Sequence, residues 1–316
     1  MSTVSSKAVG GQLQDRLNRA IEQVNGVVFG KQEAVELAFS CLVAGGHLLI
    51  EDIPGVGKTT LAQALAVSVG ADYSRIQFTS DLLPADILGV SVYRRDRENF
   101  KFHPGPIFSQ LVLADEVNRA TPKTQSALLE AMAEGHVTTE GETRPLPKPF
   151  FVIATQNPLD TVGTFPLPDS QLDRFLLSLS LGYPAPEAER RVLTEKDRQQ
   201  YMTELTPQLN PVEMEALQEL AQTIHVSEPL LDYVQDLIGA TREHPHLKIG
   251  LSPRAGLALV RCCRALALIR GRGFVIPEDV KHLFPNLAYH RLLLSESETA
   301  SIDSVIESIL SSLAIP

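Results

Sequence analysis

The stretch from residue 47 to residue 62 constrains the fold of this chain more than any other. An apolar run, His47-Leu48-Leu49-Ile50, gives way to Gly55 and Gly57 and then to a helical pattern. A polyphosphate needs several backbone N–H groups aimed at one point, and glycine allows so tight a turn because it has no Cβ. The stretch therefore predicts a strand, a phosphate-binding loop and a helix, in this order.

The side chains of this loop have distinct expected roles. Lys58 is placed to reach the β- and γ-phosphates of a nucleotide, and the Thr59 hydroxyl, in the first helical turn, is placed for Mg²⁺. The full pattern G-x-x-x-x-G-K-[ST] has a glycine where this chain has Asp52, so the match is imperfect, and a glycine turn before a surface lysine is the alternative. The expected nucleotide-binding residues of the loop are Pro54, Gly55, Val56, Gly57, Lys58, Thr59 and Thr60.

Composition narrows the classes of function. The 316 residues suit one large or two ordinary domains. The formal charge of 28 − 38 = −10 argues against a nucleic-acid binder that relies on overall charge, although a local basic stripe is compatible with it. The cysteines lack C-x-x-C spacing and lie in apolar surroundings, which favours reduced core residues: Cys41, Cys262 and Cys263.

Neither a secretory signal nor a membrane span is expected. Residues 1–10 are polar, without the apolar region of a signal peptide, and are predicted to be a loose end. The longest nearly apolar run, residues 37–50, is shorter than a membrane span and contains polar residues and glycines. We therefore expect a cytoplasmic location.

A second apolar strand, residues 111–114, is expected to deliver two carboxylates to the site. Asp115 and Glu116 follow it directly, in the Walker B pattern. Asp115 can hold hydrated Mg²⁺, and Glu116 can orient and activate the attacking water. The alternative is an ordinary strand end that happens to carry two acids, and the phosphate loop upstream makes it less favourable.

A third apolar strand, residues 150–155, ends in Gln156-Asn157-Pro158. Because the carboxyl ends of parallel strands lie at one edge of a sheet, Asn157 would come within reach of the γ-phosphate or the attacking water. We therefore expect Asn157 to be the polar sensor of the site. An Asn-Pro turn initiator is the alternative.

The segment before the phosphate-loop strand supplies candidates for an adenine pocket. Helical spacing predicts helices over residues 12–25 and 33–44, with Val28, Phe29 and Gly30 between them. These residues could cover the adenine ring. Ordinary core packing of Val28 and Phe29 fits the pattern equally well.

The remaining patterns predict two hairpins and a helical second half. Residues 90–106 and 137–146 alternate with period two around polar turns. The proline pair Pro184-Ala185-Pro186 marks a domain boundary, giving domains over residues 1–186 and 187–316. Helices are expected at 187–202, 212–224, 229–242, 254–270 and 277–289.

Taken in order, these motifs resemble the MoxR family of AAA+ ATPases, from about residue 30 to about residue 280. The resemblance rests on Gly55-Val56-Gly57-Lys58-Thr59, Ala114-Asp115-Glu116, Ala154-Thr155-Gln156-Asn157-Pro158 and Gln171-Leu172-Asp173-Arg174-Phe175. It implies an α/β fold in which an αβα core with a five-stranded parallel sheet precedes a smaller all-α lid domain. Subunits of such proteins usually form hexameric rings.

The resemblance also implies roles for the hairpins and for two arginines. The first hairpin looks like the family's helix-2 insert and the second like its pre-sensor hairpin. Arg174 matches the arginine finger, which reaches the γ-phosphate on a neighbouring subunit, and Arg254 matches sensor 2. Whether Arg254 serves its own subunit's nucleotide or a neighbour's stays open.

The implied activity is Mg²⁺-dependent ATP hydrolysis at subunit interfaces. It would drive chaperone-like remodelling of client proteins, often with a partner that carries a von Willebrand factor A domain. The alternatives are a DNA-translocating motor, which the acidic composition opposes, a magnesium-chelatase-like subunit for metal insertion, and a nucleotide-gated scaffold in which hydrolysis is incidental. No guanine-reading motif appears, so ATP rather than GTP is the expected nucleotide.

Overall fold

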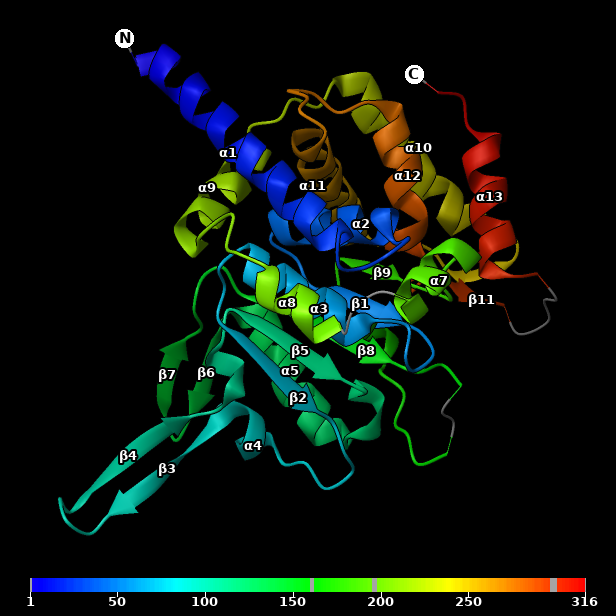
Figure 1. Cartoon of the computed structure of the whole chain (residues 1–316). Coiled ribbons are helices and arrows are strands. Elements are labelled where there is room, and N and C mark those ends of the chain that lie inside the picture. Colours follow the sequence, from blue (N-terminus) through cyan, green and yellow to red (C-terminus); the bar gives the residue numbers. More distant parts are fainter. Residues whose placement is uncertain (1, 160–161, 195–197, 296–299, 316) are drawn as a thin grey trace.

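The computed structural model in Figure 1 describes residues 2–159, 162–194, 198–295 and 300–315. A parallel sheet lies in the middle of the first half of the chain, with helices on both of its faces. Most of the helices of the second half pack against one side of this layered core (Figure 1). The expected αβα core with a helical lid is confirmed.

The sheet has five strands, all paired in parallel, in the order β2-β5-β8-β1-β9. The central strands β1, β5 and β8 are short apolar runs because helices cover both faces, whereas β2 at one edge carries several polar residues. Their bounds are β1 Leu48–Glu51, β2 Tyr73–Gln77, β5 Leu111–Asp115, β8 Phe151–Gln156 and β9 Leu177–Leu179.

Alternate residues of each strand enter different parts of the core. On β5, Leu111 and Leu113 join the larger apolar cluster with the first helices and the lid, while Val112 and Ala114 join the smaller cluster under α4 and α5. The first half contains α1 Ser2–Asn25, α2 Gln32–Val43, α3 Lys58–Ser68, α4 Pro84–Leu88, η1 Pro106–Phe108, η2 Val117–Arg119, α5 Pro122–Glu134 and α6 Asp169–Leu172.

One detail of this half differs from expectation. The predicted loose end is wrong, because α1 already begins at Ser2. Its packed part, around Leu17 and Val24, provides a formed helix, and extending a helix costs less than starting one. At the edge of the sheet, β9 spans only Leu177–Leu179, and it pairs with β1, which has four residues.

Both predicted hairpins are present as antiparallel pairs. β3 Gly89–Arg94 pairs with β4 Asn99–Pro104, and β6 His136–Thr139 pairs with β7 Glu142–Pro145. The first hairpin extends away from the body of the molecule (Figure 1).

The second half is helical, as expected, with additions that the sequence pattern did not reveal. The helix predicted over 187–202 is described as α7 and α8, and residues 195–197 between them lie outside the described residues. The last helix and a two-stranded ladder were not predicted. The elements are α7 Pro186–Thr194, α8 Arg198–Glu204, α9 Pro211–Gln222, α10 Glu228–Glu243, β10 Leu247–Ile249, α11 Pro253–Ile269, α12 Pro277–Ala288, β11 Leu293–Leu294 and α13 Ile302–Ser312.

The larger apolar cluster is continuous from the sheet through α2 into α11 and α12. The predicted reduced core cysteines are free and buried in this cluster, and the domain boundary at residue 186 stays a prediction. Within the described residues, no helix combines the length and the apolar character that crossing a bilayer requires.

Candidate nucleotide-binding site

The phosphate loop joins the end of β1 to the start of α3. Gly55 has φ +84° and Gly57 has φ +102°, values that favour glycine over any other residue. Gly57 is the residue before the first turn of α3, so the N–H groups at the start of that helix face the loop. The local geometry is that of an anion-binding turn, as the sequence predicts.

Asp52, which replaces the first glycine of the common pattern, fastens this loop to the sheet. Its Oδ2 atom accepts hydrogen bonds from the N–H groups of Leu181 (2.5 Å) and Gly182 (2.7 Å) and from the Ser180 hydroxyl (3.1 Å). Its Oδ1 atom accepts from the N–H of Ile53 at 2.8 Å. Asp52 is 5% exposed. The residue that departs from the pattern is therefore a buried aspartate whose hydrogen bonds link the loop to the segment after β9.

Lys58 lies across the loop. Its ammonium group donates to the backbone carbonyls of Asp52 (2.7 Å) and Ile53 (3.2 Å). A cavity of about 280 Å³ brings Lys58 and Thr59 together with Asp115 and Glu116. The Walker A and Walker B residues that lie far apart in the sequence therefore meet, as predicted.

A buried threonine organises the two carboxylates. The Thr155 hydroxyl on β8 donates to Asp115 Oδ1 at 2.6 Å and accepts from the N–H of Glu116 at 2.9 Å. Glu116 has φ +57°, a left-handed conformation that is rare and costly for a residue with a side chain. Such strain is typical of functional positions, and here it fixes the direction in which the Glu116 side chain leaves the strand.

Two residues of β2 complete the site and were missed from the sequence. The Arg75 guanidinium donates to Asp115 Oδ2 from Nη2 (2.5 Å) and Nε (3.2 Å). The Gln77 amide donates to Glu116 Oε2 at 2.9 Å, and Arg119 forms an ion pair with the same oxygen at 3.1 Å. The sequence did contain a signal for them: Arg75 and Gln77 are polar residues at alternate positions of a strand, so both side chains point to the same face of the sheet.

The donor set fits Mg²⁺. Thr59 and Asp115 offer a hydroxyl and a carboxylate oxygen in one cavity, and Mg²⁺ prefers such hard oxygen ligands. Among the described residues, no group of three or more His, Cys, Asp or Glu side chains is placed to hold a metal. A site with few protein ligands suits Mg²⁺, which usually keeps waters and takes further oxygens from substrate phosphates.

Asn157 lies just beyond the end of β8, between the strands that carry Walker A and Walker B. Its Oδ1 atom accepts from the N–H of Leu159 at 3.1 Å, which closes a turn. The Asn157 oxygen therefore forms the turn that was the alternative to a sensor role. The amide nitrogen is the part of this side chain that a sensor role would use.

A second cavity, of about 260 Å³, adjoins the phosphate loop on its other side. Val28 and Phe29 line it together with Val56, Tyr183 and Leu193, so both predicted adenine-pocket residues lie beside the phosphate loop. Its size and apolar walls suit a flat aromatic ring.

Gly30, in contrast, is not among the residues that line this cavity. It has φ +69°, and a Cβ on it would lie 2.9 Å from the Cβ of Ala188 on α7. We assign Gly30 to the close approach of α7 rather than to contact with a base.

Arg174 and Arg254 both line a third cavity, of about 800 Å³, which also includes Arg261, Arg264 and Arg291. This cavity contains Gly46 and His47, just before β1, whereas the phosphate loop follows β1. The four residues of β1 span roughly 13 Å at about 3.3 Å per residue, so the two sites lie at opposite edges of the sheet. Neither arginine lines the cavities around the loop of its own chain.

The five arginines differ in what they already bind. Arg261 donates to the carbonyls of Ala44 and Gly45 at the end of α2, and Arg291 binds Asp173 at 2.7 Å. Arg174 donates to the carbonyl of Leu129 at 2.7 Å through one nitrogen. The Nε atom of Arg264 is buried without a hydrogen-bond partner. Arg174, Arg261 and Arg291 are therefore already held by hydrogen bonds within their own chain.

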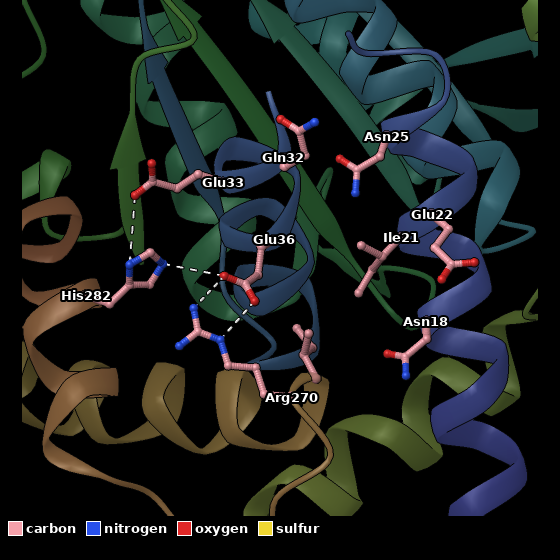
Figure 2. A pocket seen from close by; sticks show the side chains of 10 residues that line it. Asn18, Ile21, Glu22, Asn25, Gln32, Glu33, Glu36, Arg270 and His282 are labelled. Carbon is pink, nitrogen blue, oxygen red and sulfur yellow. Dashed lines mark hydrogen bonds and ion pairs between the residues drawn. The ribbon is translucent and has the colours of Figure 1, made fainter. Parts of the chain in front are cut away.

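Another polar cavity, of about 710 Å³, lies between α1, α2 and the lid (Figure 2). The Glu36 carboxylate faces Arg270 at 2.8 Å and His282 at 3.6 Å there. Burial of Glu36 opposes ionisation, but His282 and Arg270 outweigh it and lower its pKa to about 2. This network joins α2 to the lid.

The fold and this site define a P-loop nucleotide-binding protein of the AAA+ class. The family model of the ATPase family associated with various cellular activities (AAA) matches residues 47–177, and that of the AAA lid domain matches residues 239–309.

Similar proteins identify the family within the AAA+ class. The chain is 43% identical to the protein YeaC of Bacillus subtilis, over 96% of each chain, and 42% identical to Chaperone MoxR1 of Mycobacterium tuberculosis, over 95% of this chain and 82% of that protein. The crystal structure of a proposed ATPase from Cytophaga hutchinsonii covers 100% of this chain and 99% of its own, with 35% identity and a TM-score of 0.91. The chain belongs to the MoxR family of AAA+ ATPases.

Proposed function

We propose that this chain binds ATP with Mg²⁺ and hydrolyses it at the interface between two copies. One observation carries the proposal: Lys58, Asp115 and Glu116 meet in one cavity, while Arg174 and Arg254 share another at the opposite edge of the sheet. A single copy therefore holds two complementary halves of a hydrolytic site, and head-to-tail contact between copies would join them.

Each residue has a definite task in this site. Lys58 and the loop N–H groups hold the phosphates, and Thr59 and Asp115 hold Mg²⁺, which when bound neutralises phosphate charge. Glu116 accepts a proton from the attacking water. The Asn157 amide orients that water, and Arg174 of the neighbouring copy stabilises the charge that develops on the γ-phosphate.

Arg254 belongs, in this proposal, to the neighbour's site as well. It stands in the first turn of α11, in the same cavity as Arg174 and across the sheet from its own phosphate loop. A role on the nucleotide of its own chain would require the lid to move by about the length of β1, roughly 13 Å.

The biological task that we propose is chaperone-like remodelling of client proteins. The relative named Chaperone MoxR1 supports this task. A hexameric ring, a partner with a von Willebrand factor A domain and a cytoplasmic location are further parts of the proposal. The DNA motor is disfavoured by the net charge of −10, and salt-dependent DNA binding that stimulates hydrolysis would revive it.

The test measures the ATPase rate per subunit against protein concentration, with mass photometry of the same samples. We expect the rate to rise as assemblies form and to be abolished in Glu116→Gln, because that amide cannot take the proton. A rate that is independent of assembly would overturn the shared site. A rate that survives in Glu116→Gln would overturn the assignment of the base.

A further inference from the structure

Arg75 lies where a metal ion would approach Asp115. Asp115 Oδ1 is engaged by Thr155, and Oδ2 receives both the Nη2 and the Nε of Arg75. The Asp115 side chain is 11% exposed, so little of the carboxylate is left for another cation. The Arg75 side chain is 46% exposed and has solvent into which it can move.

A guanidinium and a divalent ion compete for this carboxylate. Two positive charges on one carboxylate repel each other strongly when the surroundings are only partly hydrated. The cavity that holds Arg75 also contains Thr59, the other expected metal ligand. Metal binding there therefore favours displacement of the arginine.

A continuous chain of hydrogen bonds runs from Arg75 to the proposed base. The Nη2 atom that binds Asp115 also donates to Gln77 Oε1 at 2.8 Å. The Gln77 amide nitrogen in turn donates to Glu116 Oε2 at 2.9 Å. Because an amide has one accepting and one donating end, Arg75 holds Gln77 in the orientation that restrains Glu116.

The geometry points to Arg75 as an exchangeable cation: it occupies the metal position on Asp115 in the metal-free chain and leaves when Mg²⁺ binds with nucleotide. Its departure removes the anchor of Gln77 and so weakens one of the two contacts that restrain Glu116, while the ion pair with Arg119 remains. Arg75 is thus a positioning residue that couples metal loading to the readiness of the base. This inference rests on the proposed function.

The experiment follows binding rather than turnover. A fluorescent ADP derivative is titrated with free Mg²⁺ in the unaltered chain and in Arg75→Met. We expect half-saturation at about three- to ten-fold lower free Mg²⁺ in Arg75→Met, the range for removing one half-exposed charge-assisted pair that competes with the metal. Arg75→Lys keeps the charge without the planar fork and should fall in between.

Arg119→Met is the matched control, because it removes the same unit charge from Glu116 instead of Asp115. Its half-saturation should stay within about two-fold of the unaltered chain, as expected for a partly exposed pair that does not compete. An equal shift in both methionine variants would mean a long-range charge effect and would overturn the exchange. No shift, or weaker metal dependence, in Arg75→Met would overturn it too.

A second measurement does not depend on Arg75→Met folding. The Nε–H resonance of Arg75, identified by its loss in Arg75→Lys, should move when Mg²⁺ is added to the ADP-bound chain. A resonance that stays unchanged contradicts the exchange. If the unaltered chain binds no ADP even with Mg²⁺, the proposed function and this inference both fail, whereas ADP binding without dependence on Arg75 removes the inference alone.

Discussion

Asp52 shows that a departure from a common motif can be a structural necessity. Replacing it with glycine restores the consensus, yet it removes the acceptor of four hydrogen bonds and leaves the buried N–H of Leu181 unpaired. We expect Asp52→Gly to lower the free energy of unfolding by about 2–4 kcal/mol. Urea denaturation measures it, and Asp52→Asn, which keeps one oxygen acceptor, should lose less. Unchanged stability in Asp52→Gly would contradict the bracing role.

Two buried histidines predict how stability depends on pH. Burial lowers the pKa of His47 to about 4 and that of His290 to about 3, from an ordinary value of 6.5. The unfolded chain therefore takes up protons first, so their contribution is complete above pH 6.5 and is lost as the pH falls toward 4 and 3. Each histidine contributes a slope of up to about 1.4 kcal/mol per pH unit in that window.

Urea midpoints at several pH values between 7.5 and 5 test this expectation. The double variant His47→Gln and His290→Gln should show a flatter dependence, whatever its absolute stability. An equally steep decline in that variant would assign the pH dependence to other groups.

Among the individual site residues, the sequence predicted the roles of those whose geometry is set by their neighbours in the chain. Lys58 and Thr59 follow from the loop spacing, and Asp115 follows from the end of an apolar strand. Arg75 meets Asp115 across 40 positions, through the pairing of β2 with β5, and no local pattern encodes that pairing. Asp52 looked like a defect because its partners lie about 130 residues further on.

Among the elements, the two hairpins are joined to each other and to the sheet. The Arg144 guanidinium of the second hairpin stacks on the Phe102 ring of the first, 3.9 Å from its centre. Phe102 meets Phe108 edge to face at 5.8 Å, and Phe108 lies just before β5, the strand that ends at Asp115. Through these contacts, a movement of the hairpins can be transmitted to β5, the strand that carries the Walker B carboxylate.

Removing the contact between Arg144 and Phe102 should destabilise the first hairpin. We expect Arg144→Ala to speed amide hydrogen exchange in β3 and β4 by roughly five-fold, since a cation–π contact at a partly exposed site contributes about 1 kcal/mol. Mass spectrometry of exchange measures it. Arg95→Ala, which removes an exposed arginine from the turn of the first hairpin, is the control and should leave the exchange in β3 and β4 unchanged. Equal exchange in Arg144→Ala and the unaltered chain would show that the hairpins are independent.

Helices and strands with local sequence signals were predictable, whereas those formed by long-range pairing were not. The helix expected over 254–270 is present as α11, and Ser252, which precedes Pro253, caps it by accepting from the N–H of Ala255 at 3.2 Å. The ladder of β10 with β11 joins segments more than 40 residues apart, one of them two residues long. Such short pairings leave no periodicity to detect.

For the whole molecule, the opposite placement of the two half-sites makes a strong prediction. Arg174→Ala should keep nucleotide binding and lose hydrolysis by about 10³-fold or more, as for other arginines supplied in trans. Lys58→Ala should lose binding. Mixed one to one, the two inactive variants should regain about a quarter of the activity, since a quarter of random head-to-tail interfaces combine an intact loop with an intact arginine.

Single-turnover assays on mixed and unmixed samples measure this recovery. A mixture of unaltered chain with Glu116→Gln provides the reference for random assembly. If the mixed variants stay inactive although they assemble together, Arg174 does not act on a neighbour.

The separation of the half-sites by the sheet also has a consequence for heredity. With the shared site that we propose, a subunit that assembles but lacks Arg174 would inactivate the nucleotide site of an unaltered neighbour, while its own site would still receive the arginine of the next copy. In a cell with one normal and one altered version of the gene, the damage would therefore spread to products of the normal version. Loss of Arg174 would behave as a dominant trait, whereas a change that prevents folding altogether would behave as a recessive one.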